Sequence, residues 1–241
     1  MKEFHAIRKF LSSRPRGNSQ SERMENFYKH QATYYDSFRT RLLTQRESIY
    51  SNIGVPVQGK WLEVGGGTGS NLEYLAEELK KLHSVTIFDL CPSLLNVARD
   101  RIKKNNWENV HVHMGNALKL PFPDQSFDRV VFSYSLSMMK DWELAVHEAH
   151  RVLKTGGRIG VVDFFVSDEK LWDDFKIHSW WTRNFWPKWF AIDHVFIKKS
   201  QAEFLLQTFR TVKVFEGKHA IPYLSFLGKV PRYTFIGERL K

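Results

Sequence analysis

Cysteine and long apolar runs are scarce or absent in this chain of 241 residues, and each absence excludes a class of protein. The single Cys91 excludes an internal disulfide framework and a cysteine-rich zinc site, and it fits a reducing compartment. No apolar run reaches the ~18 residues that a helix needs to cross a bilayer. The first residues, MKEFHAIRKFLSSRPRG, lack the continuous apolar core of a secretory signal. We therefore expect a cytoplasmic protein.

Acidic residues are outnumbered, and the basic excess is unevenly distributed. The chain carries 36 Lys and Arg against 26 Asp and Glu, a formal net charge of +10. The net charge is +5 over residues 1–50 and +6 over residues 196–241, whereas residues 51–195 carry −1. Basic ends of this kind favour an anionic partner such as an acidic membrane surface, with plain solubility as the alternative.

Strands and helices alternate along most of the chain, which predicts one α/β domain over residues 25–241. Residues 1–24 read as a basic, serine-rich arm, either a disordered tail or a short helix at a membrane interface. Strands are expected at residues 60–64, 84–89, 110–114, 127–133, 157–163, 211–216 and 233–237, and helices at about 22–51, 70–82, 92–104, 142–153 and 201–209. This order predicts a Rossmann-like, doubly wound, mostly parallel seven-stranded sheet with an antiparallel final strand pair.

A glycine-rich turn follows the first expected strand, in Trp61-Leu-Glu-Val-Gly-Gly-Gly-Thr-Gly-Ser-Asn71. Glycines at a strand-to-helix turn permit positive φ and let a ligand approach the backbone closely. Ser70 occupies the position of the last glycine in a dinucleotide-binding G-x-G-x-x-G, which weakens a nicotinamide interpretation. Glu63 precedes the glycines by two residues. We expect it to face a cationic group, such as the ammonium of a cofactor that carries an amino acid.

Asp89 ends the second expected strand, twenty residues after Gly69. A carboxylate at this strand end can accept hydrogen bonds from both hydroxyls of a ribose, and capping of the helix that starts at residue 92 is a compatible alternative. Cys91, next to it, is expected to be a packed residue rather than a nucleophile. The histidine pairs at 111/113 and 147/150 lack further ligands nearby, so no metal site is predicted.

Several motifs, taken together, resemble the class I S-adenosylmethionine-dependent methyltransferases. They are Glu63-x-Gly65-x-Gly67-x-Gly69, Asp89, the turn Gly115-Asn116-Ala117 and the stretches 120–128 and 153–158. The resemblance implies S-adenosyl-L-methionine as the cofactor, with its methionine part at the loop and Glu63, its ribose at Asp89 and its adenine at the Asn116 turn. An Asp is common where this chain has Asn116. The cofactor-binding residues implied are Glu63, Gly65, Gly67, Thr68, Gly69, Asp89, Leu90, Asn116, Ala117, Ser133 and Tyr134.

A longer set of segments, from about Phe27 to Gly237, looks like the methyltransferase part of betaine lipid synthases. They include residues 34–38, 87–95, 132–136, 160–165, 185–193 and 233–237. This resemblance implies a lipid substrate at a membrane surface, a diacylglyceryl-homoserine whose amino group is methylated three times. It also implies a partner enzyme that supplies the homoserine lipid.

Three other functions stay open. The same fold can methylate another lipid, a quinone or a small amine, because fold does not fix substrate. An RNA-directed protein would explain the basic charge, but no RNA-binding module is recognisable, so no nucleic-acid partner is expected. A cofactor-binding partner without catalysis is disfavoured by the intact loop and Asp89.

Methyl transfer to an amine requires alignment, exclusion of water and a proton acceptor rather than a covalent nucleophile. The candidate catalytic residues are Tyr35, Tyr134, Asp163 and His194. Tyr34, beside Tyr35, is a further candidate contact. Arg46 and Arg232 are candidates to bind the carboxylate of the head group. The alternatives are half-buried packing for the tyrosines, a helix cap for Asp163 and an exposed position for His194.

Five of the eight tryptophans lie within residues 172–189. Their density predicts an aromatic, helical, lid-like segment over residues 168–200, in which Trp186, Trp189 and Phe190 contact the lipid substrate. Ordinary packing of helices on the sheet is the alternative. With the basic ends of the chain, such a segment leads us to expect peripheral association with an anionic membrane surface.

Overall fold

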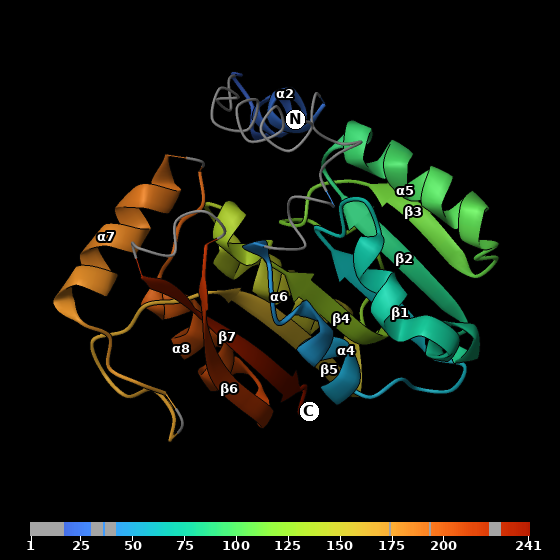
Figure 1. The fold of residues 1–241 in the computed structure, drawn as a ribbon. Helices are drawn as coiled ribbons and strands as arrows, with labels where there is room; N and C mark the ends of the chain where they lie inside the picture. Colours follow the sequence, from blue (N-terminus) through green and yellow to red (C-terminus); the bar gives the residue numbers. More distant parts are fainter. Residues whose placement is uncertain (1–16, 30–35, 37–41, 174, 193, 222–227) are drawn as a thin grey trace.

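A seven-stranded sheet forms the centre of the molecule (Figure 1). The computed structural model describes residues 17–29, 36, 42–173, 175–192, 194–221 and 228–241. The strands are β1 (Lys60–Val64), β2 (Ser84–Asp89), β3 (Val110–Met114), β4 (Phe127–Ser133), β5 (Leu153–Phe164), β6 (Arg210–Ala220) and β7 (Lys229–Glu238), in the spatial order β3-β2-β1-β4-β5-β7-β6. Strands β1 to β5 pair in parallel, and β7 is antiparallel to both β5 and β6. The predicted fold class is confirmed.

Helices cover both faces of the sheet. They are α2 (Gln20–Tyr28), α4 (Arg46–Asn52), the 3₁₀ helix η2 (Ser70–Lys81), α5 (Pro92–Asn105), the 3₁₀ turn η3 (Leu136–Met138), α6 (Trp142–Val152), α7 (Trp180–Ala191) and α8 (Lys199–Thr208). Helices α4, η2 and α5 bury apolar side chains in one core cluster, and α6 and α8 do so in a second. Both faces of the parallel strands are therefore buried, as their apolar sequences require.

Three helical segments differ from the expectation. In the range expected as one helix over 22–51, the described residues include α2 and α4, residues 30–35 and 37–41 lie outside the described part, and α2 begins at Gln20, inside the arm expected over 1–24. The helix expected at 70–82 is 3₁₀, with non-helical dihedrals at Ala76. Within the described part of residues 168–200, α7 and the start of α8 are helical, whereas most of the residues before α7 form irregular structure.

The strand order places a ligand site at one edge of the sheet. β1 neighbours β2 on one side and β4 on the other. The chain therefore adds β2 and β3 on one side of β1 and the later strands on the other side. Ligands of doubly wound folds bind in the crevice beyond the carboxyl ends of the strands at such a switch point. None of the described helices is long and apolar enough to cross a membrane.

Candidate active site

The glycine loop after β1 has a conformation that needs glycine. Gly65 and Gly67 have φ values of +69° and +54°. A Cβ atom on Gly65 would lie 2.5 Å from the Cβ atom of Ser135, too close for any side chain there. The Ser135 hydroxyl donates to the Val64 carbonyl (2.9 Å), which holds the residues after β4 against the loop. The backbone of the loop therefore borders the crevice without side chains at these two positions.

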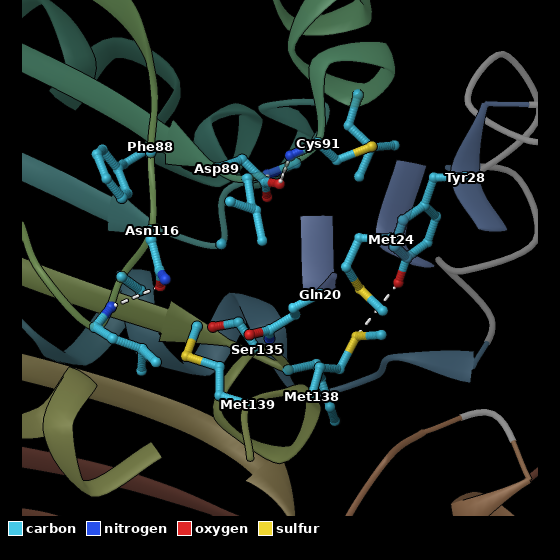
Figure 2. Close-up of a pocket in the computed structure, with 18 of the residues that line it drawn as sticks. Gln20, Met24, Tyr28, Phe88, Asp89, Cys91, Asn116, Ser135, Met138 and Met139 are labelled. Atoms are coloured by element: carbon cyan, nitrogen blue, oxygen red, sulfur yellow. Dashed lines mark hydrogen bonds between the residues drawn. The ribbon is translucent and has the colours of Figure 1, made fainter. Parts of the chain in front are cut away.

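Asp89 connects the loop to the start of α5. Its carboxylate accepts a hydrogen bond from the backbone N–H of Gly67 at 2.9 Å. It accepts a second from the backbone N–H of Cys91, also at 2.9 Å (Figure 2). Burial raises the pKa of Asp89 above its usual value, and the backbone donors oppose that shift. The carboxylate is thus fixed at the end of β2, where it borders the pocket.

Most of the predicted cofactor residues meet in one pocket. Those that line it are Gly65, Gly67, Asp89, Leu90, Asn116, Ala117, Ser133 and Tyr134. The Asn116 side-chain oxygen accepts from the Leu118 N–H at 3.0 Å, which orients the amide at the pocket rim (Figure 2). Its amino group and the second lone pair of its oxygen can meet an adenine edge. Three predicted residues, Glu63, Thr68 and Gly69, are not part of the lining.

Glu63 is not part of the lining of this pocket, and its contact with the cofactor stays a prediction. Its carboxyl group lies beneath the loop, 2% exposed, and accepts from the Tyr50 hydroxyl (3.0 Å) and the Trp61 indole (2.8 Å). Burial raises the pKa of Glu63 to about 7, although the hydrogen bonds from Trp61, Tyr50 and Asn71 lower it. Side chains two apart in a strand share a face, so Glu63 lies on the buried face that Trp61 occupies. In this structure Glu63 supports the loop through its hydrogen bonds with Tyr50 and Trp61.

Thr68 also points away from the pocket. It is 1% exposed, and its hydroxyl donates to the Asp36 carboxylate at 2.7 Å. Its role in this structure is to attach the loop to a more N-terminal part of the chain.

Helix α2 closes the pocket, and sequence reasoning missed it. Gln20, Met24 and Tyr28 of this helix contribute to the lining (Figure 2). The Glu25 carboxylate accepts hydrogen bonds from the Ser93 N–H (3.2 Å), the Ser93 hydroxyl and the Cys91 thiol (3.1 Å). Burial raises the pKa of Glu25, but these bonds outweigh it and lower the pKa overall. The helix is thereby attached to the first turn of α5, beside Asp89.

A helix-start signal was present in the sequence. The Ser19 hydroxyl accepts from the Glu22 N–H (3.1 Å), and the Glu22 carboxylate accepts from the Asn18 N–H (2.9 Å). The spacing Ser-x-x-Glu is typical of a helix N-terminus. It locates α2 but does not reveal that α2 reaches the pocket, because that placement depends on tertiary contacts.

Of the three candidate catalytic residues that the structure describes, Tyr134 lines the pocket. Tyr134 has a φ of +54°, uncommon for a residue with a side chain, and its hydroxyl donates to the Thr44 carbonyl at 2.5 Å. Burial raises the pKa of Tyr134 well above its usual value, so the phenol stays neutral and is unsuited to act as a base at neutral pH. Tyr34 and Tyr35 lie outside the described residues.

Asp163 and His194 do not line the pocket. Asp163 is fully buried and accepts from the backbone N–H groups of Ser137 (2.9 Å) and Phe164 (2.8 Å). Burial raises the pKa of Asp163 to about 6, against these bonds. His194 follows α7 with a φ of +57° and lies beside Phe196. Direct proton transfer from a pocket-bound amine to either residue is not supported by this arrangement.

Two of the three predicted lid residues are packed in the core, as expected from the alternative of ordinary helix packing. Trp186 and Phe190 are 1% and 6% exposed, because they lie four residues apart on the inward face of α7. Phe190 packs on Phe164 (ring centroids 4.5 Å apart), and Phe164 packs on Tyr134 (4.9 Å). Trp189 is half-buried against Phe185. These aromatic side chains support the pocket wall from behind.

Comparisons with known proteins agree with this geometry. Residues 62–161 match the family model described as a methyltransferase domain. A demethylmenaquinone methyltransferase from Listeria welshimeri is 37% identical over 102 residues, 42% of this chain and 43% of that protein. The ubiquinone/menaquinone biosynthesis C-methyltransferase UbiE from Vibrio vulnificus is 35% identical over 122 residues, 48% of this chain and 47% of that protein. The chain thus spans about half the length of the relatives it matches.

A solved structure shares the fold over nearly the whole chain. Phosphoethanolamine N-methyltransferase 2 from Haemonchus contortus, in complex with S-adenosyl-L-methionine, superposes with a TM-score of 0.69 at 16% identity, covering 93% of this chain and 61% of that one. The pocket described above, with the glycine loop, Asp89 and Asn116, lies largely within the matched residues. Residues 62–161 therefore resemble a methyltransferase domain in sequence, and the fold as a whole resembles that of a solved methyltransferase.

Proposed function

We propose that the chain is an S-adenosyl-L-methionine-dependent N-methyltransferase that methylates the amino group of a diacylglyceryl-homoserine lipid three times. The Asp89 carboxylate, held beside the glycine loop at the end of β2, carries the methyltransferase part of the proposal. The lipid part is supported by the segments that resemble betaine lipid synthases. Three of these segments, 34–38, 185–193 and 233–237, lie outside the matched residues 62–161, and the last of them is in β7.

S-adenosyl-L-methionine supplies a methyl group bound to a sulfonium. The residues of the chain then have to bind the cofactor, align the amine with its methyl group and exclude water. Asp89 would hold the ribose and Asn116 the adenine edge. Met24 and Tyr28 of α2 cover the pocket and limit access of water. The rings of Tyr28 and Tyr134 contribute to the lining, and aromatic faces stabilise an amine as it becomes cationic.

The test is mass spectrometry of the lipid products. The purified protein is incubated with methyl-labelled S-adenosyl-L-methionine and diacylglyceryl-homoserine in mixed vesicles. We expect mass gains of one, two and three methyl groups, with the trimethylated lipid accumulating. Absence of any gain, in protein that binds the cofactor by calorimetry, would overturn the lipid substrate and leave the methyltransferase domain in place.

Quinone methylation is the second candidate, favoured by the 37% identity to a demethylmenaquinone methyltransferase. Demethylmenaquinone replaces the lipid in the same assay. A robust mass gain on the quinone, with none on the homoserine lipid, would make quinone C-methylation the function.

We also propose that α7 docks the protein on an anionic, cytoplasmic membrane surface, where a partner enzyme would supply the homoserine lipid. Helix α7 lies at the outer side of the molecule (Figure 1), and its first residues, Trp180 and Trp181, are 69% and 56% exposed. The helix contains Arg183 and Lys188 and no acidic residue. Tryptophan favours the boundary between water and lipid, and each basic residue near an anionic surface contributes about 1 kcal/mol.

Replacing Trp180 and Trp181 together by Ala is expected to reduce binding to vesicles that contain phosphatidylserine by roughly tenfold, because the exposed indoles are lost. Sedimentation with vesicles measures the bound fraction. Leu144→Ala, which removes a 52% exposed apolar side chain from α6, is the matched control and should bind as the wild type does. Equal binding of all three proteins would contradict docking through α7.

A further inference from the structure

Arg232 is a buried arginine at the pocket edge of the sheet. It lies near the start of β7, opposite Phe164 at the carboxyl end of β5, and it is 0% exposed. Because β7 runs antiparallel to β5, its first residues reach the edge at which the parallel strands end. Arg232 thus lies on the side of the molecule that carries the glycine loop and Asp89, but outside the cofactor lining.

The guanidinium of Arg232 is only partly satisfied. Its Nη1 donates to the Leu42 carbonyl (3.3 Å) and to the Thr44 hydroxyl. Its Nε and Nη2 are buried and have no hydrogen-bond partner of acceptable geometry among the described residues, and the nearby Tyr134 hydroxyl interacts with the guanidinium and raises its pKa. Within the described part of the chain, no carboxylate forms an ion pair with it. Burial lowers the pKa of Arg232, yet arginine remains charged in proteins.

Two aromatic rings form the walls around this charge. The guanidinium lies 5.8 Å from the ring centroid of Tyr134 and 5.5 Å from that of Phe164. Tyr134 lines the cofactor pocket, and its hydroxyl donates to the carbonyl of Thr44, the residue whose hydroxyl accepts from Arg232. The side chain of Tyr134 therefore separates the guanidinium from the pocket.

The two unpartnered nitrogens have a defined geometry. Nε–H and the adjacent Nη2–H point in parallel from one edge of the guanidinium. This fork of two donors can form one hydrogen bond to each oxygen of a carboxylate. Arg46 is also buried, but its donors have partners. Its Nε donates to the Leu43 carbonyl (2.9 Å) and its Nη1 to the Asn71 side-chain oxygen (3.0 Å). Burying a charge without a partner is costly, so an unpaired fork of this kind is expected where a ligand completes it.

We propose that Arg232 binds the carboxylate of the methyl acceptor through Nε and Nη2. This inference rests on the proposed function, in which the homoserine head group carries a carboxylate beside the amine that is methylated. An amine held one carbon from an anchored carboxylate has a fixed position relative to the pocket wall, which is the alignment that methyl transfer requires. Since Tyr134 and residues 42–44 enclose the guanidinium, access for the carboxylate requires one of them to move.

The first experiment compares diacylglyceryl-homoserine with its methyl ester, which lacks the negative charge. We expect Arg232→Gln to lower kcat/KM on the acid lipid on the order of 100-fold and on the ester less than about threefold, so that the wild-type preference for the acid disappears. Arg232→Lys keeps the charge but lacks the paired N–H donors. Its kcat/KM on the acid lipid should therefore lie between the values of the wild type and Arg232→Gln. An unchanged preference for the acid in Arg232→Gln would overturn the proposal.

Two readouts separate binding from a structural role. The melting temperature of Arg232→Gln should equal or exceed that of the wild type, because an unpaired buried charge is removed. Its affinity for S-adenosyl-L-methionine should stay within about twofold. Arg210→Gln, at a side chain that is 58% exposed, makes the same charge change on the surface and should leave every value unchanged. A large loss of stability in Arg232→Gln, with equal losses on acid and ester, would assign Arg232 to the fold.

A second experiment does not depend on the homoserine lipid. Wild type and Arg232→Gln, both saturated with S-adenosylhomocysteine, are titrated with octanoate and with octanamide by calorimetry. We expect the wild type to bind octanoate at least about tenfold more tightly than octanamide, and the variant to bind both alike. If the wild type shows no preference for octanoate, the carboxylate site is overturned even where lipid methylation succeeds. If the preference is present but the lipid is not methylated, the site stands and the substrate is a different carboxylate.

Discussion

Replacing Asp89 by Ala is expected to weaken S-adenosyl-L-methionine binding by about 100-fold or more. The side chain accepts two backbone hydrogen bonds at 2.9 Å and borders the pocket at the end of β2, where ribose hydroxyls bind in this architecture. Hydrogen bonds to a charged group contribute about 1.5–3 kcal/mol each. Loss of the ribose contacts alone therefore accounts for the expected factor, since about 1.4 kcal/mol changes an affinity tenfold.

Asp89→Ala also leaves the N–H groups of Gly67 and Cys91 without their acceptor, which loosens the glycine loop. Asp89→Asn separates the two effects, because it keeps one acceptor oxygen and removes the charge. We expect its affinity to fall by roughly tenfold, between the wild type and Asp89→Ala. Calorimetric titration with S-adenosyl-L-methionine and with S-adenosylhomocysteine measures all three proteins.

Asp128→Asn is the matched control for Asp89. The Asp128 carboxylate also joins separate parts of the chain, since it accepts from the Lys60 N–H and from the Lys154 ammonium, each at 2.8 Å. It lies outside the pocket lining. We expect this control to change the melting temperature without changing cofactor affinity. Cofactor affinity within twofold of the wild type in Asp89→Ala would contradict the role given to Asp89.

The parallel part of the sheet and the loop side of the pocket were accessible to sequence reasoning because their signals are local. Apolar strands, positive-φ glycines and the acid at a strand end occupy consecutive stretches of the chain. Gly65, Gly67, Asp89 and Asn116 accordingly line one pocket, as predicted.

The remaining errors come from side-chain direction and tertiary contact. The position of Glu63 before the glycines gave no sign that its carboxyl turns toward Tyr50 and Trp61. The pairing of Glu25 with Ser93 joins residues 68 positions apart and, with the packing of Phe27 and Tyr28, holds α2 over the pocket. The break at Ala76 has no glycine or proline to signal it. For α2 the deciding interaction lies far along the chain, whereas for Glu63 it includes Trp61, two residues away in the same strand.

At Trp186 the lid interpretation and the structure predict different effects of a substitution on stability. Its indole is 1% exposed and contacts Phe185 and Phe190, with ring centroids 4.9 and 6.1 Å away. A residue of a lid would tolerate truncation without loss of stability. A core residue leaves a cavity, which costs about 3–5 kcal/mol for Trp→Ala.

Trp186→Ala is therefore expected to lower the melting temperature by roughly 10 °C, because 1 kcal/mol corresponds to about 2–4 °C in a domain of this size. Thermal denaturation followed by circular dichroism measures the shift. Trp180→Ala, on the same helix but 69% exposed, should leave the melting temperature within about 1 °C of the wild type. If Trp186→Ala kept the wild-type melting temperature and cofactor affinity while losing activity on the lipid, Trp186 would be a substrate contact after all. The aromatic chain from Phe190 through Phe164 to Tyr134 gives the physical reason to expect the opposite, since a cavity at Trp186 removes support from the wall of the pocket itself.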